Sequence, residues 1–293
     1  MILVTGCTGL VGNSLVRRLL DEGHPVRGLS RKPPARQDPT TKSLQFFRGS
    51  VADVATLDGA MEGVDTVIHL VGILVETGTQ TFANIHQVGT QNVVDVAKRR
   101  GVQRIIHMSS LGTRPQAASL YHRTKWEAEE YLRRSNLPHT IFRPSVIFGA
   151  RDNFVNQFAR IMRYTPFMPI LGDGRSRMQP IWVEDVVHCV VTAMNDPETI
   201  GQTFELGGPE RLTFIEIMEA IAATMGKNRL KFYLPMPLLR LEAAVMERLL
   251  PRPPLTSDQL LMLREDNICD IDTMVKTFKI EPRNFREGIR TYL

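Results

Sequence analysis

The stretch that decides the fold is Ile2–Gly12, "ILVTGCTGLVG". The apolar run Ile2–Thr5 predicts a short buried strand. After the glycines, Leu15, Leu19 and Leu20 recur at the spacing of one helix face. The chain therefore begins with a strand, a glycine turn and a helix.

The three glycines of the turn, Gly6, Gly9 and Gly12, have the spacing G-x-x-G-x-x-G. Gly6 permits a tight turn, Gly9 lets the backbone approach a pyrophosphate, and Gly12 lets the helix pack closely on the sheet. The helix N-terminus would then face the anion. The turn predicts dinucleotide binding; the alternative is a structural turn that binds nothing.

Strands and helices alternate up to about residue 150, and the apolar runs are nearly continuous. Such runs are typical of parallel strands covered on both faces. We predict a doubly wound α/β sheet with its ligands at the carboxyl ends of the strands. The predicted strands after the first are 24–30, 44–48, 65–71, 103–108 and 139–148, with helices over 84–100 and 121–135.

The remaining chain, residues 151–293, has a different character. Amphipathic helices are predicted over 154–164, 214–225 and 238–250, separated by Pro-rich turns. We expect a dinucleotide-binding domain over residues 1–150, joined by a returning strand near 180–208 in which "QTFELGG" (202–208) lies. Residues 151–293 mainly form a smaller, mostly helical substrate or lid lobe.

The second strand ends in Ser30, Arg31 and Lys32, with no carboxylate to hold a ribose 2′-hydroxyl. A guanidinium pairs with a 2′-phosphate, so NADP is favoured and NAD is the alternative. Arg31 and Lys32 are otherwise solvated charges of the loop "KPPARQDPTTK" (32–42). Asp53 is placed to accept a hydrogen bond from the adenine amine, or to cap the helix that follows it.

A tyrosine and a lysine, Tyr121 and Lys125, follow the strand that ends in "HMSSLG". Four residues apart on a helix, their side chains share one face. A phenol has a pKa of about 10, and a nearby ammonium group together with a nicotinamide cation favours the phenolate. The pair therefore suits acid–base chemistry, although it also fits the start of an amphipathic helix beside a purely structural site.

These motifs together resemble the extended form of the short-chain dehydrogenase/reductase superfamily, in which T-G-x-x-G-x-x-G precedes a strand-end Ser and Y-x-x-x-K. The resemblance implies a Rossmann fold with Tyr121 as proton donor or acceptor and Lys125 as the residue that holds the ribose and lowers the tyrosine pKa. It makes Ser110, or second Ser109, the hydrogen-bond donor to a substrate carbonyl. The predicted cofactor-binding residues are Gly6, Thr8, Gly9, Leu10, Val11, Gly12, Ser30, Arg31, Lys32, Asp53, Val54, Leu70, Val71, Gly72, Lys125 and Pro144.

Three segments, 143–159, 179–186 and 253–267, are similar to one branch, the alpha-subcomplex subunit 9 family of respiratory complex I and its bacterial relatives. In that subunit a tightly bound NADPH has a structural role and the Tyr/Lys pair is commonly absent, whereas "YHRTK" is intact here. Members that act on nucleotide sugars carry an Asn where this chain has His86 and an Arg where it has Met178. Both departures weaken an epimerase interpretation.

Three functions follow. The first is an NADP-dependent oxidoreductase acting on a carbonyl or quinone-like small molecule. The second is an accessory or assembly protein of a respiratory complex that holds NADPH without turning it over. The third, a nucleotide-sugar epimerase or dehydratase, oxidises and re-reduces its substrate within one site and would prefer NAD, so Ser30–Lys32 counts against it.

Composition narrows the partners. With 43% hydrophobic and 23% charged residues, the chain is ordinary for a globular protein, and its net charge of +5 includes no Lys/Arg block typical of nucleic-acid binding. Cys7, Cys189 and Cys269 show neither disulfide nor metal-ligand spacing, so we expect no metal and a reducing cytoplasm.

No apolar run reaches the roughly 18 residues of a membrane span, and the strand at Ile2 leaves no room for a targeting segment. Oligomerisation stays open.

Two features have competing interpretations. The apolar stripe of residues 238–250 is expected to be buried in the small lobe; the alternative is peripheral docking on a membrane or a respiratory-complex subunit, which suits a hydrophobic substrate. His86 either positions a water or substrate or is satisfied by a backbone carbonyl.

Overall fold

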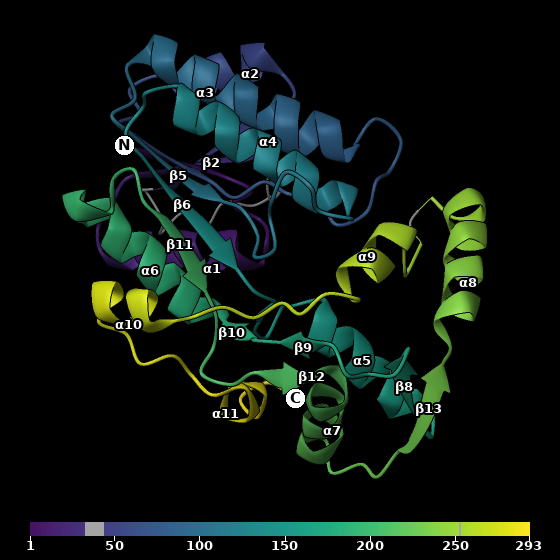
Figure 1. Cartoon of the computed structure of the whole chain (residues 1–293). Helices are drawn as coiled ribbons and strands as arrows, with labels where there is room; N and C mark the ends of the chain where they lie inside the picture. The colour runs from purple at the N-terminus through teal and green to yellow at the C-terminus, as the bar shows by residue number, and fades with distance from the viewer. Residues whose placement is uncertain (33–43, 252) are drawn as a thin grey trace. The chain divides into compact units, whose positions relative to one another are not determined.

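The computed structural model describes residues 1–32, 44–251 and 253–293, so the predicted loop 32–42 lies outside the described residues except for Lys32. The chain divides into two compact units (Figure 1). The first comprises Met1–Arg143 and Val186–Phe204, and the second Pro144–Asp185 and Glu205–Leu293. The chain thus leaves the first unit after Arg143 and returns to it at Val186.

The first unit is built on a seven-stranded sheet in the order β11-β6-β5-β4-β1-β2-β3. Neighbouring strands from β3 to β6 pair in parallel, and the bonds Ile141 N–H to Gln202 O and Ser145 N–H to Leu206 O advance together along β6 and β11, as parallel strands require. The predicted doubly wound parallel sheet is confirmed. Its strands are β1 Ile2–Thr5, β2 Val26–Ser30, β3 Leu44–Arg48, β4 Thr66–His69, β5 Arg104–Met108, β6 His139–Pro144 and β11 Thr203–Leu206.

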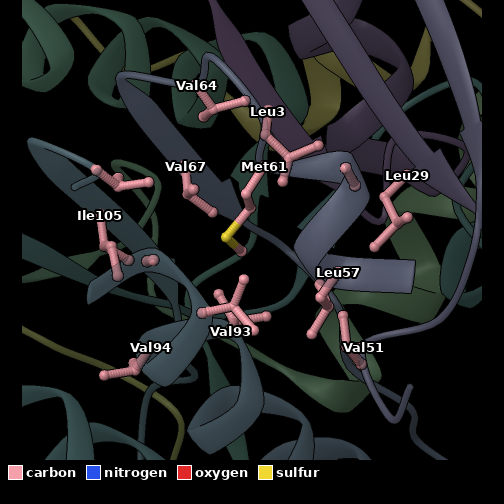
Figure 2. Close-up of a cluster of buried hydrophobic side chains, with 14 of the residues drawn as sticks. Leu3, Leu29, Val51, Leu57, Met61, Val64, Val67, Val93, Val94 and Ile105 are labelled. Carbon is pink, nitrogen blue, oxygen red and sulfur yellow. The ribbon is translucent and has the colours of Figure 1, made fainter. Parts of the chain in front are cut away.

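Helices cover both faces of this sheet, α3 and α4 on one and α1 and α6 on the other (Figure 1). Figure 2 shows the core beneath α3, where Val93 and Val94 meet Leu3, Val67 and Ile105 of three neighbouring strands, all buried. The strands read as apolar runs because both faces are covered in this way. The helical elements are α1 Leu10–Asp21, α2 Val54–Ala60, the π-helix η1 Ala83–Val88, α3 Gly89–Arg100, α4 Leu120–Arg134, α6 Val183–Asn195 and the short 3-10 helix η2 Pro197–Thr199.

The second unit is mostly helical, as predicted, and also contains three two-stranded sheets, β7–β10, β9–β12 and β8–β13. These strands are two to five residues long, too short for an alternating pattern to stand out in the sequence. Its elements are β7 Ile147–Phe148, α5 Phe154–Tyr164, β8 Phe167–Leu171, β9 Arg177–Met178, β10 Ile181–Trp182, β12 Leu212–Thr213, α7 Phe214–Thr224, β13 Leu230–Leu234, α8 Met236–Leu249, α9 Ser257–Met262, α10 Asp272–Phe278 and α11 Phe285–Ile289.

The single strand predicted over residues 139–148 is wrong: β6 ends at Pro144 and β7 begins at Ile147. Proline has no N–H for the ladder. The Ser145 hydroxyl then donates to the Asn267 carbonyl at 3.1 Å, which ties the break to a distant part of the chain. A contact so remote in sequence is invisible to a local pattern.

The predicted burial of the 238–250 stripe holds for only part of α8. Leu239 and Ala243 are buried and pack with Leu260. The side chains of Leu241 and Leu249, in contrast, keep 64% and 74% of their surface exposed. Among the described residues, no helix has the length and apolar character to cross a bilayer.

Gly12 sets how closely α1 approaches the preceding turn. A Cβ atom at Gly12 would lie 2.2 Å from the carbonyl oxygen of Gly6 and 2.8 Å from the Cα of Cys7. Both obstacles are backbone atoms, which cannot rotate away. At Gly9, by comparison, an added Cβ would meet the Gly6 oxygen at 3.2 Å, close but tolerable with a small shift.

We predict that Gly12→Ala destabilises the protein by about 3 kcal/mol, the upper end for overpacking, because backbone must move. Gly9→Ala is its matched control and should cost about 1 kcal/mol or less, since Gly9 is an N-cap residue with φ of −73° that alanine adopts. Chemical denaturation of both variants measures the difference. Equal losses would show that the turn accommodates a side chain at position 12.

Candidate functional site

The predicted site residues gather at one edge of the sheet, where the carboxyl ends of the parallel strands lie. Gly6–Gly12 follow β1, Ser30–Lys32 follow β2, Leu70–Gly72 follow β4, Ser110 follows β5 by two residues, and Pro144 ends β6. Connections from β1 lead to β2 on one side while β4 lies on the other, so the strand order reverses between β1 and β4. Ligands of doubly wound proteins bind at such a reversal.

The glycine turn fits a pyrophosphate. Gly6 has a φ of +74°, which the tight turn requires. Gly9 is the N-cap of α1, and within the described residues no side chain caps the helix there. The N–H groups of the first helical turn, which includes Leu10 and Val11, are therefore free of a competing side-chain acceptor. A helix N-terminus of this kind attracts an anion through its N–H groups and its dipole.

The segment after β2 presents two exposed cations. Ser30 is half-buried and its hydroxyl accepts the Lys32 N–H at 3.3 Å, while the Arg31 and Lys32 side chains are exposed. The Asp53 Oδ1 accepts the N–H groups of Ala55 at 3.0 Å and Thr56 at 3.3 Å. Asp53 is therefore the N-cap of α2, which Val54 opens, and its role toward adenine stays a prediction.

Lys125 is buried and held by the sheet. Its side chain is 3% exposed, and Nζ donates a hydrogen bond to the Met108 carbonyl at 2.9 Å. Burial lowers the pKa of Lys125 to about 8, against the opposing charge of Glu129. The β4 loop comes so close that a Cβ atom at Gly72 would lie 3.3 Å from Nζ. The ammonium is thus fixed between the ends of β4 and β5.

Tyr121 lies in the first turn of α4, which Ser119 caps by accepting the His122 N–H at 3.1 Å. The phenol ring is buried and meets the rings of Phe82 and His86 edge-on, with centroids 5.9 Å and 5.1 Å away. Lys125 follows one turn later on the same helix. The two residues singled out by sequence are therefore both buried at the carboxyl edge, on a rigid helix.

His86 has a defined tautomer. The Ile73 N–H donates to its Nε2 at 3.1 Å, so that nitrogen carries no proton, and Nδ1 lies 3.0 Å from the Thr124 hydroxyl oxygen. Burial and the charge of Lys125 lower the His86 pKa to about 2. The ring is thus a neutral Nδ1–H donor to Thr124. The predicted satisfaction by a backbone carbonyl is wrong; a backbone N–H and a hydroxyl satisfy the ring.

Two more buried histidines, which the sequence analysis did not assign to the site, lie on neighbouring strands. His69 of β4 pairs in register with Thr5 of β1 and with His107 of β5, and its Nδ1 lies 2.7 Å from the Thr5 hydroxyl. Its Nε2 lies 3.1 Å from the Thr90 hydroxyl. Burial followed by the charge of Lys125 lowers the His69 pKa to about 3. The sequence signal that could have assigned them to the site is the presence of a histidine near the carboxyl end of each of two apolar strands.

His107 is buried, and among the described residues neither ring nitrogen has a hydrogen-bond partner. Its ring centroid is 5.2 Å from that of His69. Burial above all holds its pKa well below the ordinary range. The buried lysine is therefore the cation of this polar cluster, and the three histidines around it are neutral.

The two serines after β5 differ in access. Ser109 is buried, and its Oγ donates to the Thr113 hydroxyl at 3.4 Å. Ser110 is half-buried and its Oγ donates to the Leu111 carbonyl at 3.3 Å, a bond that a better acceptor can replace. Access thus favours Ser110, while its role toward a substrate stays a prediction. In the described part of the chain no group of three or more His, Cys, Asp or Glu side chains could hold a metal ion.

A parallel seven-stranded sheet, an uncapped glycine turn at its reversal point and a buried Tyr–Lys pair define a dinucleotide-binding protein of the extended short-chain dehydrogenase/reductase type. Residues 2–207 match the model of the NAD dependent epimerase/dehydratase family, and the chain belongs to that family.

The proteins to which this chain is similar belong to several functional classes. The chain is 29% identical over 287 residues, 93% of its own length and 70% of the other's, to "NADH dehydrogenase [ubiquinone] 1 alpha subcomplex subunit 9, mitochondrial" of Arabidopsis thaliana. It is 28% identical to the "Ceramide reductase" of Caulobacter vibrioides, over 81% of this chain and 74% of that one. The solved structure "MoeE5 in complex with UDP-glucose and NAD" superposes with a TM-score of 0.78 at 20% identity, covering 99% of this chain and 96% of that one, which shows the shared fold.

We predict that His107→Met stabilises the protein, because it removes a buried ring whose nitrogens lack partners; the gain at neutral pH should be about 1 kcal/mol or more. The gain should grow as pH falls below about 6.5, since the unfolded chain then protonates a histidine that the folded chain keeps neutral, by up to about 1.4 kcal/mol per pH unit. Urea denaturation of wild type and variant from pH 7 to pH 5 measures it. A variant that is less stable throughout, with an unchanged pH slope, would contradict this assignment.

Proposed function

We propose that the protein is an NADP-dependent oxidoreductase that reduces a carbonyl or quinone-like small molecule. The observation that carries the proposal is the buried pair Tyr121 and Lys125 at the carboxyl edge of the sheet, with the lysine held by the Met108 carbonyl. A protein that merely stores a dinucleotide has no need to bury an ammonium group beside a phenol. Burial of that charge costs folding free energy, and ionisable groups that are buried at such a cost cluster at functional sites.

The chemistry divides between cofactor and chain. When bound, the nicotinamide supplies a hydride to the carbonyl carbon of the substrate. Tyr121 donates its phenolic proton to the carbonyl oxygen, so a ketone, one hydride and one proton together give an alcohol. Lys125 stabilises the phenolate that remains and binds the ribose hydroxyls, and Ser110 donates a hydrogen bond to the carbonyl oxygen. The neutral histidines leave Lys125 as the cation that favours phenolate.

The preference for NADP rests on the chain after β2. Arg31 and Lys32 are both exposed there, directly after a strand end where a carboxylate would otherwise accept the ribose 2′-hydroxyl. A 2′-phosphate is drawn to a guanidinium and an ammonium. The structurally similar MoeE5 was solved with NAD, so cofactor choice is the finer part of this proposal.

Replacement of Tyr121 by Phe should lower the rate of NADPH oxidation about 10²- to 10⁴-fold, because it removes the proton donor while keeping the ring. NADPH affinity, followed by nicotinamide fluorescence, should stay nearly unchanged. The assay presents a panel of aldehydes, ketones and short-chain quinones to the loaded protein.

The control for this variant is Tyr131→Phe, on the same helix, whose hydroxyl donates to Asp95 at 2.7 Å near the surface. It should keep wild-type turnover. If no acceptor oxidises bound NADPH, or if both variants behave as wild type, the oxidoreductase proposal fails.

The double variant Arg31→Ala/Lys32→Ala should weaken NADPH binding about tenfold while leaving NADH binding unchanged, because only the 2′-phosphate loses its charged partners. Fluorescence titration with both nucleotides gives the ratio. Arg134→Ala, an exposed arginine at the far end of α4, is the control for loss of positive charge. A parallel loss of NADH affinity would place these side chains elsewhere on the cofactor.

A second candidate is an accessory subunit that holds NADPH without turnover. It is favoured by the name of the Arabidopsis relative, a subunit of a respiratory dehydrogenase. In that case NADPH binds tightly, no acceptor discharges it, and Tyr121→Phe changes nothing. The same experiments therefore separate the two candidates.

The epimerase alternative has less support. Met178, where sugar-nucleotide enzymes of the superfamily carry an arginine, is buried in the core of the second unit. The neighbouring Arg177 is taken by Asp266, to which its Nε and Nη2 donate at 2.9 Å and 2.6 Å. Both donors go to the same Oδ2 oxygen, so binding a diphosphate would require Arg177 to give up this ion pair.

A further inference from the structure

The second unit carries an exposed surface of aromatic and aliphatic side chains on the ribbon of β8 and β13. Leu230 pairs in register with Phe167, and Phe232 with Pro169, so these four residues face the same side of the ribbon. Leu230 is 68% exposed and Phe232 is 51% exposed. The Phe167 and Phe232 rings touch, with centroids 5.7 Å apart. Side chains of this size are ordinarily buried.

The opposite face of the β8–β13 ribbon packs against the core of the second unit along β8, which leaves the face with Phe167, Leu230 and Phe232 exposed. Met168 and Ile170 point to the opposite side and are buried in the core of the second unit with α5 and α7. β8 is therefore anchored by one face and presents the other, whereas Lys231 and Tyr233 of β13 stay exposed on the anchored side. Tyr164, at the end of α5 and three residues before Phe167, is 80% exposed and extends this apolar surface.

The apolar surface continues along the chain into α8, which follows β13 directly (Figure 1). Leu234 of β13 packs against the buried Leu239 side of α8. The opposite side of the helix exposes side chains at intervals of three and four residues, which places them in one stripe. The stripe consists of Leu238, Leu241, Val245 and Leu249, all exposed.

Charge around this surface is mainly positive, although α8 also exposes Glu242 and Glu247. Residues 154–172 and 226–241, which contain the ribbon and the start of α8, include Arg160, Arg163, Lys227, Arg229, Lys231 and Arg240 and no Asp or Glu. Lys231 pairs with Glu219 of α7, and Arg229 donates to the Met162 carbonyl at 2.7 Å. Arg160, Arg163 and Lys227 are exposed. The chain as a whole is nearly balanced, with a net charge of +5, so this concentration is local.

We propose that one face of the second unit, the basic–apolar face, docks the protein on an anionic lipid bilayer. This face consists of Tyr164, Phe167, Leu230, Phe232, the α8 stripe and the flanking cations Arg160, Arg163 and Lys227. Apolar side chains enter the boundary between headgroups and acyl chains, aromatic rings lie at the headgroup level, and the cations meet lipid phosphates. The positive excess over residues 154–172 and 226–241 beside exposed apolar side chains is complementary to the phosphates of an anionic membrane. The face is peripheral, because no described helix can span a bilayer.

This proposal is independent of the oxidoreductase chemistry. Every residue of the basic–apolar face belongs to the second unit, while Tyr121, Lys125 and the glycine turn belong to the first. Failure of one proposal therefore leaves the other standing.

Co-sedimentation of the full chain with vesicles tests it. Vesicles of phosphatidylcholine mixed with phosphatidylglycerol should bind the protein, and vesicles of phosphatidylcholine alone should bind it at least tenfold more weakly. Added salt should weaken the binding, since charge attraction at a surface is screened. The double variant Leu230→Ser/Phe232→Ser should lose at least tenfold in affinity. Arg160→Gln/Arg163→Gln should lose about fivefold per arginine on the anionic vesicles alone.

Matched controls come from the first unit. Leu74→Ser removes an exposed leucine, 53% exposed, and Arg17→Gln/Arg134→Gln removes two exposed arginines. Both should bind as wild type does, and circular dichroism verifies the fold of every variant. Absence of binding to anionic vesicles overturns the proposal, as does equal loss in the control variants. A dimer in sedimentation equilibrium that dissociates in Leu230→Ser/Phe232→Ser, with no vesicle binding by the wild type, would assign the face to a second copy of the chain instead.

Discussion

The close approach of α1 to the glycine turn is the constraint on which the site depends. With hydrogen in place of a side chain, Gly12 lies where a Cβ atom would stand 2.2 Å from the Gly6 oxygen. This approach places the N-terminus of α1 at the carboxyl end of β1, beside β4, where the strand order reverses. The loop after β4 also brings Gly72 beside Lys125. The glycine turn, which would bind the anion, and Lys125, which belongs to the acid–base pair, therefore lie at the ends of the neighbouring strands β1 and β4.

The buried ammonium group of Lys125 is surrounded by neutral polar groups. Lys125 has the Met108 carbonyl as its partner, and the nearby His69, His86 and His107 stay neutral because they are buried beside it. A second charge in this interior would cost several kcal/mol. Hydroxyl groups of threonine satisfy His69 and His86 without adding charge. The polar interior thus supports a single ammonium group, one turn of α4 after the buried Tyr121.

Much of the fold was predictable because its signals are local. The strand Leu44–Arg48 and the helix Phe154–Tyr164 have the predicted bounds, and the glycine turn lies where its spacing placed it. The mostly helical lobe was also predicted, as α5, α7 and α8 show, but its short strands were missed and the strand predicted through Pro144 was wrong, since short strands that pair across long stretches of chain leave no period to detect. Likewise, the partner of His86 turned out to be the N–H of Ile73, which the helical pattern around His86 does not contain.

The sequence by itself determined the alternation of strands and helices, the anion-binding turn and the placement of Tyr121 and Lys125 on one helix face, because each depends on spacing along a few turns of chain. Only the tertiary structure decided that Lys125 is buried, that His69 and His107 stand side by side, and that the α8 stripe is exposed while Leu239 and Ala243 are buried. Burial and charge state depend on which distant segments meet, and the register of strands such as β4 and β5 is set by the packing of the whole sheet.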